Sequence, residues 1–239
     1  MTDPLPLVLL PGMNCTARLW TPVLAGLSDR GDRGGGSARP ILHGEVRGRD
    51  LEDCLSHLLA TLPERFALAG LSLGGIVAMA LARVAPERID RLCLLDTNAR
   101  APSTAQLESF DRQIARIEDG LTSRRAQEEL LDVLVHPDHQ SRLREEVLTM
   151  GEETGARRLA EQYAIQRTRG DERQGLTQRD VPVAVIAGAE DALCPPERHH
   201  EIVELVPGSR LSLIPGVGHL STMEAPGSVG RAMRHWLAA

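Results

Sequence analysis

The chain has 239 residues and a mass of 26.0 kDa, with a formal net charge of −6, 42% hydrophobic residues and 25% charged residues. This composition is ordinary for a globular protein, and the acidic balance provides no basic surface for nucleic acid or an anionic membrane. All 27 basic side chains counted as Lys or Arg are Arg, which excludes chemistry that needs a Schiff-base lysine or a P-loop lysine.

The cysteines and the N-terminal residues bear on the compartment of the protein. No two cysteines have C-x-x-C spacing, so we expect reduced thiols and neither a structural zinc site nor a disulfide framework. The N-terminus has Asp3 in place of a basic segment, and Pro6 interrupts its apolar run, so we expect no signal peptide. The apolar runs are too short to span a bilayer. These features together predict a soluble cytoplasmic protein.

Apolar runs in the first part of the chain predict strands that are buried on both faces of a parallel sheet: Leu7–Leu10, Phe66–Gly70 and Arg91–Asp96. Helices are expected after Asp50, which can act as an N-cap, and over Gly74–Val84.

Between these elements lies the segment Ser28–Arg39, which contains the Gly34-Gly35-Gly36 triplet and which we interpret as a flexible loop. A phosphate cradle is the alternative, but the segment lacks both a lysine and a helix start.

The pattern changes after Asp96. From about Thr104 to Thr168 there is only helical periodicity, with apolar side chains such as Leu107, Phe110, Ile114 and Val147. Alternation then resumes with a strand over Val181–Ala187, a helix over Glu197–Leu205, a strand over Arg210–Ile214 and a last helix through Trp236. This order predicts an α/β fold, with a mostly parallel sheet flanked by helices over residues 1–100 and 179–239. A helical cap over residues 101–178 is inserted between its strands.

The sequence Gly70-Leu71-Ser72-Leu73-Gly74 fits G-x-S-x-G and lies between a predicted strand and a predicted helix. A nucleophile elbow turns so sharply that only small residues fit on either side of the serine. The alternative is a glycine-rich turn with an incidental serine. The strand–helix context favours Ser72 as a nucleophile.

A serine hydroxyl needs a neighbouring base, and the chain has eight histidines. His219 follows the predicted strand Arg210–Ile214, which places it at the same sheet edge as Ser72. His43 also ends a strand and is its rival. His199 and His200 lie on a predicted helix between acidic residues, where we expect exposure.

The base needs a carboxylate to fix its tautomer. Asp191 follows the predicted strand Val181–Ala187 and gives the chain order Ser…Asp…His. Asp96 is the alternative acid, and its non-catalytic role would be a helix cap or a contact to the cap.

The oxyanion needs two backbone donors, which we predict to be the N–H groups of Leu73 and Met13. Met13 as a core-filling side chain is the alternative.

The sequence resembles the α/β-hydrolase superfamily of cofactor-free esterases and related enzymes. The matching segments are L-P-G-M with Trp20 downstream, A-G-L-S-L-G-G, A-P-E-R-I-D-R-L, V-I-A-G-A-E-D-A-L-C-P-P and G-V-G-H-L-S. The resemblance implies hydrolysis of an ester-like bond through an acyl-enzyme, and a helical cap. The serine at the elbow argues against relatives that use aspartate there, the haloalkane dehalogenases and epoxide hydrolases.

The leading hypothesis is therefore a serine hydrolase that cleaves a small-molecule carboxylic ester, without a cofactor or metal and without nucleic-acid or membrane partners. Because aromatic residues are only 2%, we expect a pocket of aliphatic side chains and Met. The alternatives are the same triad acting as a lactonase, thioesterase, C–C hydrolase or lyase, and a ligand-binding receptor with residual activity.

Overall fold

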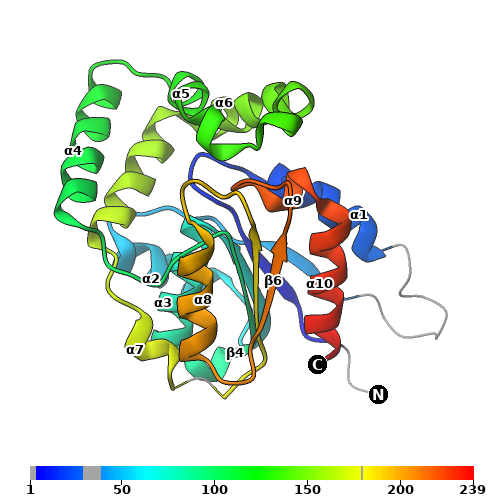
Figure 1. Ribbon diagram of the computed structural model, residues 1–239. Coiled ribbons are helices and arrows are strands. Elements are labelled where there is room, and N and C mark those ends of the chain that lie inside the picture. Colours follow the sequence, from blue (N-terminus) through cyan, green and yellow to red (C-terminus); the bar gives the residue numbers. More distant parts are fainter. Residues whose placement is uncertain (1–3, 29–38, 179) are drawn as a thin grey trace.

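The computed structural model describes residues 4–28, 39–178 and 180–239 and contains one parallel sheet (Figure 1). The sheet has six strands in the order β2-β1-β3-β4-β5-β6. Every adjacent pair of strands is parallel, so all the strands end at the same edge. The strands are β1 (Leu7–Leu10), β2 (Ile41–His43), β3 (Phe66–Leu71), β4 (Ile89–Leu95), β5 (Val183–Gly188) and β6 (Arg210–Ile214).

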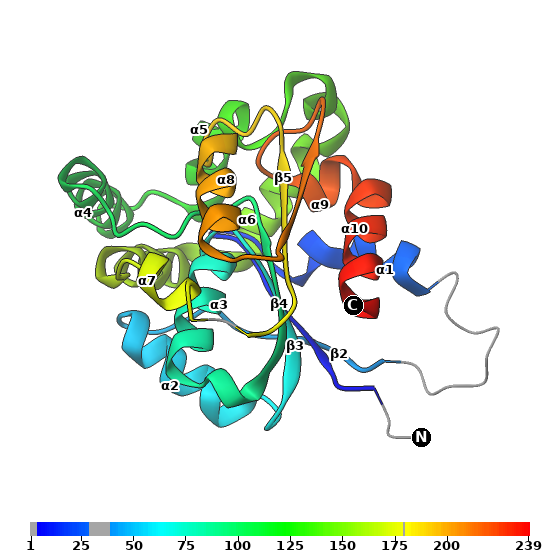
Figure 2. The ribbon, with the colours of Figure 1, turned by 60° about the horizontal axis from the view of Figure 1, so that its bottom comes forward.

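The sheet is covered by helices on both faces because its central strands are apolar on both faces. In β1, Val8 and Leu10 contribute to one core cluster, and Leu7 and Leu9 contribute to the other. On the first face pack α2 (Leu51–Thr61), α3 (Leu73–Val84) and α8 (Pro196–Leu205); on the second pack α1 (Thr21–Ser28) and α10 (Pro226–Ala238). Figure 2 shows these two groups on opposite sides of the strands. The expected α/β fold with a parallel sheet is confirmed.

Four helices are inserted between β4 and β5: α4 (Thr104–Glu118), α5 (Ser123–Leu134), α6 (Pro137–Thr168) and α7 (Arg173–Leu176). Ser103 and Gln106 form a capping box at the start of α4. The long helix α6 is kinked at Gly155, whose φ of 77° lies in the left-handed region. Figure 1 shows α5 and α6 lying over one end of the sheet. The first three of these helices form the cap, whereas α7 packs against α3 and α8 of the core.

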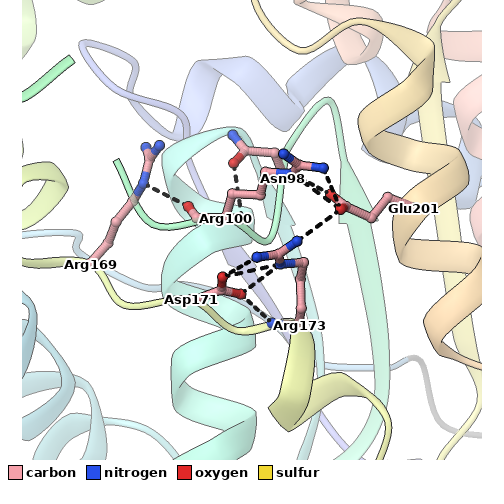
Figure 3. A network of polar contacts seen from close by, with 6 residues as sticks. All are labelled: Asn98, Arg100, Arg169, Asp171, Arg173 and Glu201. Atoms are coloured by element: carbon pink, nitrogen blue, oxygen red, sulfur yellow. Dashed lines mark hydrogen bonds and ion pairs between the residues drawn. The ribbon is translucent and has the colours of Figure 1, made fainter. Parts of the chain in front are cut away.

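The two ends of the cap are joined to the core by a charged network (Figure 3). Glu201 on α8 accepts hydrogen bonds from Arg100, in the segment that leads into α4, at 2.8 Å, and from Arg173, at the start of α7, at 3.3 Å. Asp171 also binds Arg173, and the Nε atom of Arg169 donates to the carbonyl oxygen of Arg100 at 3.2 Å. One carboxylate of the core therefore holds both linkers of the cap.

The remaining differences from the sequence-based expectations are local. The predicted flexible loop Ser28–Arg39 lies outside the described residues, apart from its first and last positions; Ser28 ends α1. The strand expected from Val181 begins instead at Val183, directly after Pro182, which has no N–H to donate to a sheet. Among the described residues, no helix is long and apolar enough to cross a membrane.

Candidate active site

Ser72 lies in a tight turn between β3 and α3. Its backbone has φ 54° and ψ −115°, a strained conformation for a residue with a side chain. A Cβ atom at Gly70 would lie 2.2 Å from the carbonyl oxygen of Gly74, and one at Gly74 would lie 2.3 Å from the carbonyl oxygen of Leu10. Only glycine therefore fits at these two positions, which explains the small residues on either side of Ser72.

The structure brings Ser72, His219 and Asp191 together in one hydrogen-bonded row. The Nε2 atom of His219 lies 2.8 Å from the Oγ atom of Ser72, and its Nδ1 atom lies 2.8 Å from Oδ2 of Asp191. The other carboxylate oxygen of Asp191 accepts hydrogen bonds from the backbone N–H groups of Leu193 and Cys194, both at 2.9 Å. Because both carboxylate oxygens can only accept when ionised, the Nδ1 atom of His219 carries its proton and Nε2 faces the serine as an acceptor.

The electrostatic surroundings of His219 favour its charged form. Burial lowers the pKa of the imidazole, but the charge and hydrogen bond of Asp191, assisted by Asp96 and Glu224, outweigh burial and raise it above its ordinary value of 6.5. An imidazolium that forms next to Ser72 is therefore stabilised by the acids around it.

The hydrogen bonds of the carboxylate of Asp96, the alternative acid, go to residues outside the cap. This side chain is fully buried, and its carboxylate accepts hydrogen bonds from the backbone N–H of Gly188 at 3.0 Å and from the hydroxyl of Ser221 at 2.5 Å. Burial, followed by the nearby charge of Asp191, raises the pKa of Asp96 well above its usual range. The geometry therefore gives His219 a direct hydrogen bond to Asp191, whereas Asp96 supports the neighbouring loops.

Among the described residues, His219 is the only histidine that hydrogen-bonds to the Ser72 hydroxyl. His43 is exposed at the end of β2. The expectation that His199 is exposed is wrong: it is completely buried, and the backbone N–H of Thr97 donates to its Nε2 atom at 3.0 Å. Burial lowers the pKa of His199 to about 4, so the side chain is neutral. His200, the next residue, is exposed as expected.

The two predicted oxyanion donors are the backbone N–H groups of Leu73, in the turn after β3, and of Met13, in the loop after β1. Leu73 is the first residue of α3, so its N–H has no partner within the helix. Met13 lines the pocket next to Ser72 and also packs against two apolar clusters. Its position is therefore compatible both with a backbone donor at the oxyanion and with a core-filling side chain.

A pocket opens at the Ser72 hydroxyl beneath the cap. Its volume is about 40 Å³. The pocket is therefore smaller than an engineered protein cavity of about 150 Å³ that binds benzene. The lining is mostly aliphatic, and among the described lining residues Tyr163 is the one Phe, Tyr or Trp side chain. The described lining residues are Gly12, Met13, Asn14, Cys15, Leu71, Ser72, Ala126, Gln127, Leu130, Leu134, Leu159, Tyr163, Leu193, His219 and Leu220.

Comparison with known proteins agrees with this architecture. The profile of the alpha/beta hydrolase family matches residues 7–232. The chain belongs to the alpha/beta hydrolase family. It is 25% identical over 186 residues to a pimeloyl-(acyl-carrier protein) methyl ester esterase from Neisseria meningitidis, across 74% of this chain and 72% of that protein.

Solved structures of similar proteins cover nearly the whole of this alpha/beta hydrolase. A thermophilic esterase from Thermogutta terrifontis matches with a TM-score of 0.82 and 27% identity, over 100% of this chain and 91% of that chain. A hydrolase from Pseudomonas aeruginosa matches with a TM-score of 0.81 and 28% identity, over 98% of this chain and 90% of that chain. The likeness therefore includes the cap as well as the sheet.

Within the part of the chain that the structure describes, one group of residues has the donor types of a metal site. Potential ligand atoms of Asp191, Cys194 and His219 lie within 4.8 Å of one another. However, the Asp191 and His219 atoms are already engaged in the hydrogen bonds described above, and the Cys194 sulfur accepts from the Nδ2 atom of Asn98 at 3.7 Å. Burial raises the pKa of the Cys194 thiol to about 12, which disfavours the thiolate that a metal would need.

Sequence reasoning missed a buried acid that fixes the histidine loop. The carboxylate of Glu224 accepts hydrogen bonds from the backbone N–H groups of Gly218 at 3.0 Å and Leu220 at 3.1 Å, on either side of His219. It also accepts from the N–H of His136 in the cap at 2.9 Å. Its position just after the G-V-G-H-L-S segment was the only available signal.

Several apolar cap residues singled out in the sequence do not line the pocket, whereas Leu159 and Tyr163, which extend the same helical pattern, do. Leu107, Phe110, Ile114 and Val147 do not line it. The lining comes instead from α5, a helix that was not distinguished in the sequence, and from the second half of α6. The i, i+4 spacing of Ala126, Leu130 and Leu134 on α5 is the pattern that could have revealed this face.

Proposed function

We propose that this protein hydrolyses esters of small carboxylic acids through an acyl-enzyme formed on Ser72. The observation that carries the proposal is the row of two 2.8 Å contacts from Ser72 through His219 to Asp191 at the floor of the pocket. A nucleophile, a base and an orienting acid in this arrangement are what ester hydrolysis without a cofactor requires. The similar proteins named as esterases support the same reaction class.

In this mechanism, His219 accepts the Ser72 proton on Nε2 while the serine oxygen attacks the ester carbonyl carbon. Asp191 keeps the other proton on Nδ1 and stabilises the imidazolium. The N–H groups of Leu73 and Met13 are proposed to donate to the oxyanion. The C–O bond then breaks, and the proton on Nε2 passes to the departing alcohol. A water molecule then attacks the acyl carbon while His219 takes its proton. The bond to the Ser72 oxygen breaks, the carboxylic acid leaves, and His219 returns the proton to Ser72.

The proposal is tested with the purified protein and its Ser72→Ala variant. A fluorophosphonate probe should label the wild-type protein but not the variant, and hydrolysis of p-nitrophenyl acetate should be lost with the labelling. Ser221→Ala serves as the matched control, because Ser221 is a buried serine that hydrogen-bonds to Asp96 rather than to His219. Labelling that persists in Ser72→Ala would reject Ser72 as the nucleophile.

A further inference from the structure

The histidine loop, residues 215–220, is held by the cap as well as by the core. The carbonyl oxygen of Leu134, the last residue of α5, accepts hydrogen bonds from the backbone N–H groups of His219 at 3.1 Å and Leu220 at 3.2 Å. The last carbonyl groups of a helix have no partner within that helix, so this oxygen is available to both donors. The backbone at His219 is thus bound to the end of a cap helix.

The side chain of Glu224 binds both the histidine loop and the cap. Glu224 ends α9 (Ser221–Glu224) and is only 5% exposed. Its Oε1 atom accepts from the backbone N–H of Leu220 at 3.1 Å, whereas its Oε2 atom accepts from Gly218 at 3.0 Å and from His136 at 2.9 Å. His136 lies between α5 and α6, in the segment that we call the cap junction (residues 135–136). One carboxylate oxygen therefore joins the histidine loop to the cap.

The histidine loop and the cap junction are also in close backbone contact. A Cβ atom at Gly218 would lie 2.9 Å from the backbone nitrogen of His136, so a side chain at this position would push the two segments apart. The cap reaches α9 as well, because Arg142 of α6 donates to the carbonyl oxygens of Met223 at 3.4 Å and Glu224 at 3.3 Å. Glu224 is therefore bound to the cap through both its side chain and its backbone.

These contacts surround a side chain whose position decides the chemistry. To accept the proton of Ser72, the Nε2 atom of His219 must stay within about 2.6–3.2 Å of the hydroxyl oxygen, and the distance is 2.8 Å. The two glycines before the histidine, Gly216 and Gly218, give the loop little stiffness of its own. The contacts that the loop makes with its surroundings therefore fix the imidazole at the serine.

Building on the proposed function, we propose that Glu224 is a positioning residue for His219 and that it acts by holding the histidine loop against the cap junction. The cap then contributes to the chemical step as well as to the pocket. Loss of the contact lets the imidazole move away from Ser72, which lowers kcat, whereas KM changes little because the Glu224 carboxylate does not line the pocket.

The first test removes the cap side of the contact with a matched pair of variants at His136. The backbone there has φ −55° and ψ 139°, which both alanine and proline can adopt. Both variants lack the imidazole, but only His136→Pro lacks the N–H that donates to Glu224, and its ring occupies the space of that N–H. With p-nitrophenyl acetate, kcat should be roughly ten- to a hundredfold lower in His136→Pro than in His136→Ala.

The second test changes the acceptor. Glu224→Gln keeps the shape of the side chain, but an amide has one acceptor oxygen and one donor group, so it cannot accept from all three N–H groups. Its kcat should fall by roughly tenfold or more with little change in KM. Glu201→Gln is the matched control, because Glu201 also joins the cap to the core, through Arg100 and Arg173, and makes no hydrogen bond to the histidine loop. It should keep the wild-type kcat.

The pH–rate profile separates positioning at His219 from a general loss of structure. Asp191, Asp96 and Glu224 raise the pKa of His219 against burial, so removal of the Glu224 charge should move the acidic limb of kcat to lower pH. The charged and titratable groups that face His219 or its loop are Asp191 after β5, Asp96 after β4, Glu224 on α9, His199 on α8, and His136, His139 and Arg142 of the cap. All of them except Glu224 are unchanged in Glu224→Gln.

The outcomes distinguish this inference from the proposed function. Equal kcat in His136→Pro and His136→Ala overturns the positioning role, and so does a loss in Glu201→Gln as large as that in Glu224→Gln. A lowered kcat in Glu224→Gln with an unmoved acidic limb assigns Glu224 to structure alone and also overturns it. Circular dichroism identifies the folded variants, and either pair decides when a member of the other does not fold. Absence of both ester turnover and fluorophosphonate labelling in the wild type rejects the proposed function, and the positioning role with it.

Discussion

The Nε2 atom of His219 lies 2.8 Å from the Oγ atom of Ser72, although the two residues are 147 positions apart in the chain. Ser72 follows β3 and His219 follows β6, with β4 and β5 between those strands in the sheet. The contact therefore depends on the loops that reach across this edge. At one crossing, a Cβ atom at Gly188 would lie 2.1 Å from the carbonyl oxygen of Gly218, so the loops after β5 and β6 are in close backbone contact.

Asp191→Asn should lower kcat by about three to four orders of magnitude while the protein stays folded, because the amide no longer fixes the productive tautomer of His219. Asp96→Asn is the matched control, since Asp96 is also buried beside the site but hydrogen-bonds to Gly188 and Ser221. Its effect on kcat should be far smaller. Steady-state kinetics on p-nitrophenyl acetate measures both variants. The reverse order of effects would identify Asp96 as the catalytic acid.

The acidic limb of the pH–rate profile should have its midpoint above pH 6.5. His219 must be neutral to accept the serine proton, and its pKa is raised above 6.5 by Asp191 and the other nearby acids despite burial. Activity is therefore present above this pKa and is lost as the pH falls through it. In Asp191→Asn the residual activity should persist to lower pH, because the main raising charge is gone. A midpoint below 6.5 in the wild type would contradict the electrostatic account.

Filling the pocket from the cap should shorten the preferred acyl chain. Ala126→Leu adds side-chain volume at a lining position of α5, whereas Leu134→Ala removes it from the same helix. Each methylene in such a pocket is worth about 1–3 kcal/mol of discrimination. A series of p-nitrophenyl esters from acetate to octanoate measures the profile of kcat/KM. Leu107→Ala on α4 lies outside the pocket and should leave the profile unchanged; identical profiles in all three variants would place specificity elsewhere.

Gly74→Ala should destabilise the fold by at least about 1–3 kcal/mol, because the added Cβ atom would lie 2.3 Å from the carbonyl oxygen of Leu10 and backbone must move to relieve the overlap. Gly26→Ala is the control: a Cβ atom there has no neighbour within 4 Å, and alanine favours the helix α1. Urea denaturation gives both free energies of unfolding. Equal stability of the two variants would show that the elbow does not need its glycine.

Much of the fold was predictable because its signals are local. Strands buried on both faces leave continuous apolar runs such as Leu7–Leu10, and the elbow glycines are required by contacts with nearby backbone. The positions of Ser72, Asp191 and His219 after β3, β5 and β6, at the same edge of the sheet, then predicted that they would meet. The structure places them in contact, and their catalytic roles stay predictions.

Other features depend on contacts between distant segments and have no periodic pattern. Asn14 owes its orientation to Gln162 and Ser123, which are 148 and 109 positions away. The exposure expected for His199 was inferred from its acidic neighbours on α8. The i, i+3 pairing of His199 with the fully buried Ile202 was the better indicator, because both face the core.

Strands β4 and β5 pair directly in the sheet, and the carboxylate of Glu201 holds Arg100 on one linker of the cap and Arg173 on the other. The inserted chain therefore leaves the core and returns to it at almost the same place. Such an insertion imposes no length requirement on the scaffold beneath it. In evolutionary terms this junction is a point where the length of the insertion can change without altering the order of the strands that carry Ser72, Asp191 and His219. Because α5 and α6 line part of the pocket, a change in the insertion alters the pocket while the sheet keeps its strand order.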